Sequence, residues 1–244
     1  MSKNVIKIII AVVLIVVIAV GVFFIIDKNK DKKQNENVTE DMKKFKEEYE
    51  ALNGKDNGSG NVYQTLTIPE YNLIKYSSAE EIVELMDGGT GIVYLGFPIC
   101  PWCRNTIPEL ITAATDAGVD TIYYLDMLEV RSAWELQDGE AVEVKAGQPG
   151  YYDLLRVFAS VIEPYVLTDD AGNKFETGEL RIYVPLVIFI KDGEIIGYRD
   201  TTVELNEGQG AWNPLTASQK TELKNIFADL IDEMLGSSFC DETC

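Results

Sequence analysis

The sequence predicts an α/β fold with a central sheet covered by helices on both faces, preceded by one transmembrane helix. Three observations support this prediction. Runs of β-branched and aromatic residues alternate with segments of helical periodicity along most of the chain. The runs Gly91–Phe97 and Val119–Leu125 are mostly apolar, as is typical of strands buried on both faces. A long apolar segment also lies near the N-terminus.

That apolar segment, Ile8–Ile26, contains no charged residue and follows Lys3 and Lys7. It is long enough to cross a bilayer as a helix. A cleaved signal peptide usually has a shorter apolar region that ends at small residues. Residues 19–21 (Ala-Val-Gly) fit such an end, but the hydrophobic stretch continues beyond them. We therefore expect residues 1–26 to be an uncleaved signal anchor rather than a cleaved signal.

Residues 27–61 are predicted to form a charged linker that holds one short amphipathic helix. Thr39 is an N-cap candidate for this helix, and Asn53-Gly54 is the predicted end. Four apolar residues recur between them at helical spacing: Met42, Phe45, Tyr49 and Leu52. We expect the helix to pack on the following domain, and a partner-binding helix is the alternative.

The domain predicted over residues 62–235 begins in the order β-α-β-α-β. A strand of alternating polarity, Tyr63–Ile68, leads to a helix capped by Ser77 or Ser78. The two buried strands named above follow, and the helix between them begins at a pair of cysteines.

Residues 128–180 interrupt this alternation and are predicted to be an inserted subdomain of helix and hairpin. A segment of that length with its own helix is not a simple loop. Asp138-Gly139 indicates a small hairpin. Apolar residues between Leu154 and Ile162 indicate an amphipathic helix, with a turn after it at residues 169–173.

The domain is predicted to close with an antiparallel hairpin and a long helix. Pro185 opens a strongly apolar run, so we expect it to begin a strand, with a cis peptide bond before it. Residues 191–194 (Lys-Asp-Gly-Glu) turn the chain back into a second strand. Thr216 and Gln219 form a capping box at the start of the last helix.

Composition excludes several classes of function. The chain has 21 Lys and Arg against 40 Asp and Glu, a net charge of −19, which argues against binding to nucleic acid. It contains no histidine, which removes His-based triads and His-containing zinc sites. The four cysteines form two close pairs, Cys100 with Cys103 and Cys240 with Cys244, too few for a disulfide scaffold. We expect no metal and no cofactor.

The pair Cys100-Pro101-Trp102-Cys103 lies where a buried strand gives way to a helix. The partial positive charge of a helix N-terminus stabilises a thiolate, so the thiol pKa falls from about 8.5 to about 3.5–7.5. Cys103, one helical turn further on, is close enough to close a disulfide. An inert structural disulfide and a zinc site made of all four thiolates are the alternatives.

The order of these features resembles the thioredoxin superfamily, over about residues 62–235. That resemblance implies a central mixed sheet flanked by helices, with residues 128–180 as an elaboration. It implies that Cys100 attacks, that Cys103 resolves, and that Val184-Pro185 forms a cis-proline turn facing them. The anchor and the insertion are similar to those of membrane-anchored bacterial members, including bacteriocin transport accessory proteins. Tyr94 stands where well-studied reductants of the family have a buried acid.

On this basis we predict a membrane-tethered thiol–disulfide oxidoreductase that acts on extracytoplasmic proteins or peptides. Pro101, Trp102, Val184 and Pro185 would contact the substrate, and a membrane or soluble redox partner would recycle the dithiol. The direction, oxidation or reduction, stays open. The competing prediction is a non-catalytic accessory or binding module for a secretion or export system.

The orientation in the membrane rests on two opposed arguments. A tethered dithiol is most useful where disulfides form and persist, so we expect a single-pass cell-membrane protein with its domain outside. The positive-inside rule favours the opposite orientation. The lysines after the apolar segment outnumber Lys3 and Lys7 before it: they are Lys28, Lys30, Lys32 and Lys33.

The tail, residues 236–244, contains Cys240 and Cys244, for which three interpretations stay open. The pair forms a tail disulfide or a spare exposed pair, or it is a second redox pair that passes electrons to Cys100. The third interpretation is metal capture together with Asp241 and Glu242.

Overall fold

The computed structural model describes residues 37–236. The helices are α2 (Glu40–Glu50), α3 (Ala79–Glu84), α4 (Pro101–Asp116), α5 (Met127–Val130), α6 (Pro149–Val157) and α7 (Ala217–Leu235). The strands are β1 (Ile74–Tyr76), β2 (Gly91–Gly96), β3 (Ile122–Asp126), β4 (Ala133–Gln137), β5 (Glu140–Lys145), β6 (Glu163–Thr168), β7 (Lys174–Arg181), β8 (Leu186–Lys191) and β9 (Glu194–Arg199).

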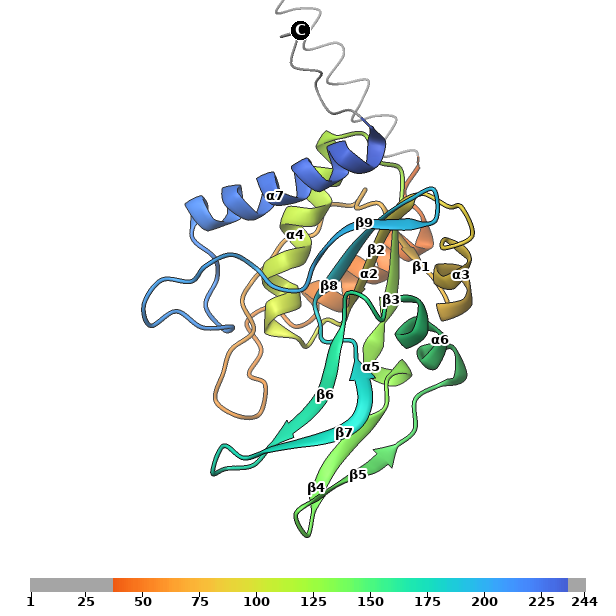
Figure 1. The fold of residues 1–244 in the computed structure, drawn as a ribbon. Helices are drawn as coiled ribbons and strands as arrows, with labels where there is room; N and C mark the ends of the chain where they lie inside the picture. The colour runs from red at the N-terminus through yellow and green to blue at the C-terminus, as the bar shows by residue number, and fades with distance from the viewer. Residues whose placement is uncertain (1–36, 237–244) are drawn as a thin grey trace, which may run out of the picture.

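Five of these strands form one mixed sheet in the order β1-β3-β2-β8-β9 (Figure 1). β1 and β2 run parallel to β3 between them, whereas β8 runs antiparallel to both β2 and β9. All residues of β2 are buried, and so is β8 up to Ile190. Burial of consecutive strand residues means that both faces of the sheet are covered. The predicted α/β architecture, a mixed sheet flanked by helices, is therefore confirmed.

Three predicted helix starts, those of α2, α3 and α7, are confirmed by the caps that the structure shows. The Met42 N–H donates to the Thr39 hydroxyl, and α2 buries Phe45 and Tyr49 in the core, as expected for a helix that packs on the domain. Ser78 rather than Ser77 caps α3 in a capping box. Thr216 forms the predicted capping box of α7.

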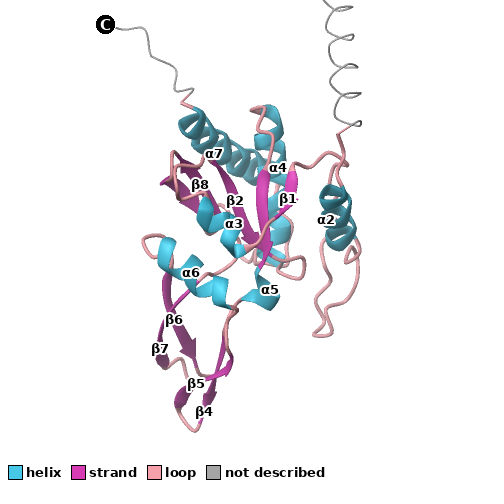
Figure 2. Cartoon of the chain, turned by 90° about the vertical axis from the view of Figure 1, so that its right-hand side faces the viewer, coloured by secondary structure: helices cyan, strands magenta, loops and turns pink. Residues whose placement is uncertain are grey.

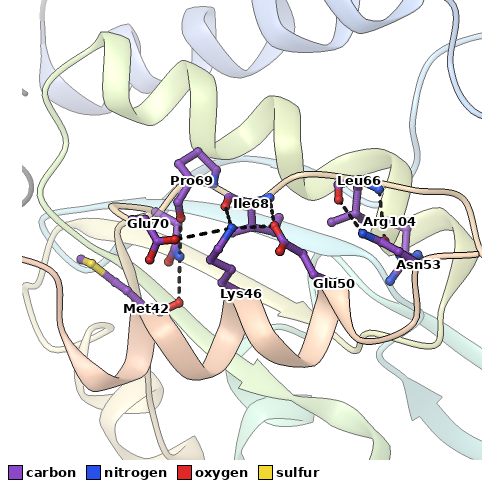
Figure 3. A network of polar contacts seen from close by, with 10 residues as sticks. Met42, Lys46, Glu50, Asn53, Leu66, Ile68, Pro69, Glu70 and Arg104 are labelled. Carbon is purple, nitrogen blue, oxygen red and sulfur yellow. Dashed lines mark hydrogen bonds and ion pairs between the residues drawn. The ribbon is translucent and has the colours of Figure 1, made fainter.

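The expected strand at Tyr63–Ile68 is wrong, because β1 at Ile74–Tyr76 occupies the first strand position. The alternating pattern has another cause: Leu66 and Ile68 are buried in the core, while their backbone pairs with side chains of α2 and of the turn that follows it. Asn53 bonds both the N–H and the carbonyl of Leu66, at 3.2 and 2.8 Å (Figure 3). Glu50 accepts from the N–H of Ile68 at 2.8 Å, and the Ile68 carbonyl accepts from Lys46 at 2.7 Å. Alternation thus marked an extended segment, but not a strand.

Between β3 and β8 the chain forms two hairpins, β4–β5 and β6–β7, that project from the five-stranded sheet (Figures 1 and 2). The hairpin turn predicted at Asp138-Gly139 is confirmed, with both residues at positive φ. The helix predicted between Leu154 and Ile162 starts earlier and ends at Val157. Hairpin β6–β7 was not predicted from the sequence, because a proline within a run argues against a strand and Pro164 lies in β6. In the structure, Pro164 lies at an irregularity in the pairing of β6 with β7.

The predicted membrane anchor and the tail cysteines lie outside the described residues. Within residues 37–236, no helix is both long and apolar enough to span a bilayer.

Candidate active site

The two central cysteines lie at the N-terminus of α4, directly beyond the end of β2. Cys100 is the N-cap residue of α4, and Pro101 occupies the first turn. The backbone N–H of Cys103 donates to Cys100 Sγ at 3.3 Å, so the sulfur acts as the capping acceptor. Both thiols are free. Cys100 is 7% exposed and Cys103 is fully buried. Cys100 is therefore less exposed than expected for a nucleophile that a protein client must reach.

The surroundings push the pKa values of the two thiols in opposite directions. The hydrogen bond from the Cys103 thiol lowers the pKa of Cys100, and this outweighs the burial that would raise it. Burial raises the pKa of Cys103 well above its usual value, and the neighbouring Cys100 sulfur raises it further. These opposite shifts favour the thiolate at Cys100 and the neutral thiol at Cys103.

The peptide bond between Val184 and Pro185 is cis, and it lies against the thiol pair. Cys100 Sγ lies 3.6 Å from the carbonyl oxygen of Val184. The pairing of Leu95 with Leu186 brings this turn to the cysteines, because the end of β2 then faces the start of β8. The structure therefore brings the two cysteines and the Val184-Pro185 turn together, although they lie in separate parts of the sequence.

The other predicted positions form the rim of the thiol pair. Pro101 and Trp102 are half-buried in the first turn of α4, and Trp102 packs against the core. Ile99 and Tyr183, each 42% exposed, directly precede Cys100 and Val184 in the chain. Sequence reasoning missed these two apolar side chains, although their adjacency to the motifs was a usable signal.

Arg131, which follows α5, is a further residue of the site that sequence reasoning missed. Its guanidinium lies 4.7 Å from the centre of the Phe97 ring, next to the thiol pair. Its positive charge contributes to lowering the pKa of Cys100. No motif marks this residue, because it reaches the site from the segment predicted as an insertion.

A buried arginine joins α4 to α2 beneath the site. Arg104 is 1% exposed and directs its guanidinium at α2 and the segment after it (Figure 3). It donates to the Tyr49 carbonyl at 2.8 Å, the Asn53 side chain at 2.7 Å and the Gln64 carbonyl at 2.8 Å. Charge-assisted bonds of this kind hold the C-terminal part of α2 against the start of α4.

Tyr94 lies beneath the cysteines on β2, where its side chain is fully buried. Its hydroxyl is 2.9 Å from that of Tyr49 on α2, and burial raises the pKa of this phenol well above its usual value. Tyr94 therefore places a buried phenol, hydrogen-bonded to α2, beneath the site.

No model of a known protein family matches this chain, and none of the curated proteins is significantly similar to it.

Proposed function

We propose that the protein is a thioredoxin-like thiol–disulfide oxidoreductase that acts on proteins or peptides. The observation that carries this proposal is the paired thiols, with the pKa of Cys100 lowered and that of Cys103 raised. An exchange enzyme needs this asymmetry, since the thiolate is the nucleophile in thiol–disulfide exchange. The cis turn at Val184-Pro185 beside Cys100 supports the proposal, because it borders the sulfur that a client must reach.

In the reducing direction, the Cys100 thiolate attacks one sulfur of a client disulfide. A bond forms between Cys100 and that sulfur, the client disulfide breaks, and one client thiolate leaves. Cys103 then loses its proton and attacks Cys100 Sγ, which closes the Cys100–Cys103 disulfide and releases the second client sulfur. The two client sulfurs take up two electrons and two protons. The oxidising direction is the same sequence in reverse.

An insulin-reduction assay of the full chain, with a disulfide-reshuffling assay beside it, tests this proposal. We expect Cys100→Ser to abolish activity, because the attacking thiol of the pair is lost. Cys103→Ser should instead accumulate a mixed disulfide between Cys100 and the client. Full activity of Cys100→Ser would contradict the proposal.

We also propose that residues 8–26 tether this domain to the cell membrane and that the domain lies outside the cytoplasm. The apolar run and the value of a dithiol in an oxidising compartment support this orientation. A reporter that is active on one side of the membrane only, fused after residue 36, measures it directly. We expect activity of the reporter that works outside; activity of a cytoplasmic reporter would reverse the orientation.

A non-catalytic accessory module is the second candidate function. The observation that favours it is the low exposure of Cys100, only 7%, which is also typical of a cysteine in a structural disulfide. In that case the two cysteines would form an inert structural disulfide, and the rim would bind a partner without thiol–disulfide exchange.

A further inference from the structure

Arg131 places a positive charge beside the thiol pair. The backbone N–H of Cys100 donates to the carbonyl of Phe97 at 3.2 Å, so these two residues close one turn. The Arg131 guanidinium lies 4.7 Å from the centre of the Phe97 ring in that turn. Its charge also contributes to lowering the pKa of Cys100. A client segment that reaches Cys100 therefore passes near this guanidinium.

The Arg131 guanidinium has no counter-ion in the part of the chain that the structure describes. It forms neither an ion pair nor a hydrogen bond there, although the side chain is half-buried. Two nearby acids are engaged elsewhere: Glu129 pairs with Lys145 at 3.4 Å, and Glu179 accepts from the Trp134 indole at 3.1 Å. The N–H donors of the guanidinium are therefore available to an acceptor from outside the chain.

The electrostatics of this position favour an incoming anion. Burial lowers the pKa of Arg131, and the nearby charge of Arg181 lowers it further. Both effects act against the cationic form of the guanidinium, and an anion beside it would offset them. A carboxylate suits the position best, because its two oxygens match the planar fork of an arginine.

The backbone on both sides of Arg131 is fixed before a client arrives. The Val130 carbonyl accepts from the backbone N–H of Gln148 at 2.9 Å. The Ser132 carbonyl accepts from the Arg181 guanidinium at 2.9 Å, and Arg181 is itself 7% exposed. An ordered segment loses less conformational entropy when a ligand binds than a mobile one does.

We propose that Arg131 is a specificity-determining residue that selects clients with an Asp or Glu next to the reactive cysteine. Its guanidinium binds the client carboxylate while Cys100 attacks the adjacent sulfur. This inference rests on the proposed exchange activity and deepens it by naming the class of client. It runs against the net charge of the chain, −19, which by itself favours cationic partners.

The test uses the full chain with Cys240→Ser and Cys244→Ser, reduced beforehand so that each molecule reacts once. The clients are three peptides with one internal disulfide each, identical except for Glu, Gln or Lys next to both cysteines. In each reaction the peptide disulfide becomes two thiols, and Cys100 and Cys103 become a disulfide. Acid quenching followed by separation of the reduced and oxidised peptides gives the rate.

Two measures remove effects that do not come from the site. Each rate is divided by the rate of the same peptide with dithiothreitol, a small dithiol, which corrects for the reactivity of the peptide itself. The ionic strength is about 0.15 M, which screens the net charge of the chain beyond about 8 Å. The corrected Glu-to-Gln ratio then reports selection by the protein.

We expect the unaltered chain to reduce the Glu peptide about tenfold faster than the Gln peptide, because a hydrogen bond between charged groups is gained. Arg131→Gln should bring this ratio to about one. A changed pKa of Cys100 cancels in the ratio, since both clients meet the same thiol. Arg131→Lys keeps the charge without the planar fork and should retain a preference of about threefold.

Arg156→Gln is the matched control. It removes the same charge from the same inserted segment, but Arg156 is exposed and pairs with Asp153 at 3.0 Å. The ratio should stay at about ten in this variant. If Arg131→Gln fails to fold, Arg131→Met takes its place with the same expectation, because it keeps an apolar stem on the Phe97 ring.

A ratio of about one in the unaltered chain would overturn the inference, and so would a faster corrected rate for the Lys peptide. Equal falls of the ratio in Arg131→Gln and Arg156→Gln would also overturn it, because net charge would then account for the selection. If the unaltered chain reduces none of the three peptides, the proposed function fails and the inference falls with it. Equal rates with all three peptides overturn the inference alone.

Discussion

At the scale of single residues, the two sulfurs of the site differ because their neighbours differ. Cys100 receives hydrogen bonds at a helix N-terminus, whereas Cys103 is fully enclosed by protein. Both cysteines and Pro185 were predictable, since each is part of a local motif. The role of Arg131 was not predictable, because its distance from the thiols depends on the tertiary structure of residues 127–181.

The charge of Arg131 gives a prediction at this scale. Arg131→Gln should raise the pKa of Cys100, since the positive charge that favours the thiolate is lost. Cys103→Ala should raise it more, because the hydrogen bond from Cys103 is the largest cause of the lowered value. The rate of alkylation of Cys100 against pH, with the tail cysteines changed to serine, measures both shifts.

Arg131→Lys is the matched control, because it keeps the charge beside the site. Its alkylation profile should stay close to that of the unaltered chain. An Arg131→Gln profile that coincides with the unaltered one would show that the charge does not act on Cys100.

At the scale of elements, α2 is part of the site rather than an appendage of the linker. It supplies Tyr49 to the Tyr94 hydroxyl, and Arg104 binds its C-terminal part from α4. The helix and its packing face followed from spacing and from the Thr39 cap. The hydrogen bond between Tyr49 and Tyr94 could not be predicted, because the two residues are 45 positions apart and no local pattern links them.

The segment after α2 gives a prediction at this scale. Asn53→Ala leaves the N–H and carbonyl of Leu66 without their side-chain partner and removes one acceptor of Arg104. We expect the free energy of unfolding to fall by about 1–3 kcal/mol. Urea denaturation of the reduced protein measures the change.

Lys43→Ala on the same helix is the control for that measurement. Lys43 forms an exposed ion pair with Glu40, and such pairs contribute little to stability. The variant should unfold at nearly the same urea concentration as the unaltered chain. Equal losses in the two variants would contradict the role given to Asn53.

At the scale of the whole molecule, the site lies at one end of the central strands of the mixed sheet. β2 and β3 are parallel and end at the paired residues Gly96 and Asp126, and β8 begins opposite the end of β2. Residues 127–181 leave and rejoin the sheet at this end, and both hairpins project from it (Figure 1). The sheet was predictable because its central strands are continuous apolar runs. Hairpin β6–β7 was not predictable, because Pro164 in β6 argues against a strand.

The reduction potential of the Cys100–Cys103 pair tests the central claim most directly. Stabilisation of the Cys100 thiolate favours the reduced form, so a working pair should have a potential near that of thioredoxin, about −270 mV, or above it. Equilibration of the full chain, with Cys240→Ser and Cys244→Ser, against redox buffers of known potential gives this value. A potential below about −300 mV would mark a structural disulfide and contradict the proposed exchange activity.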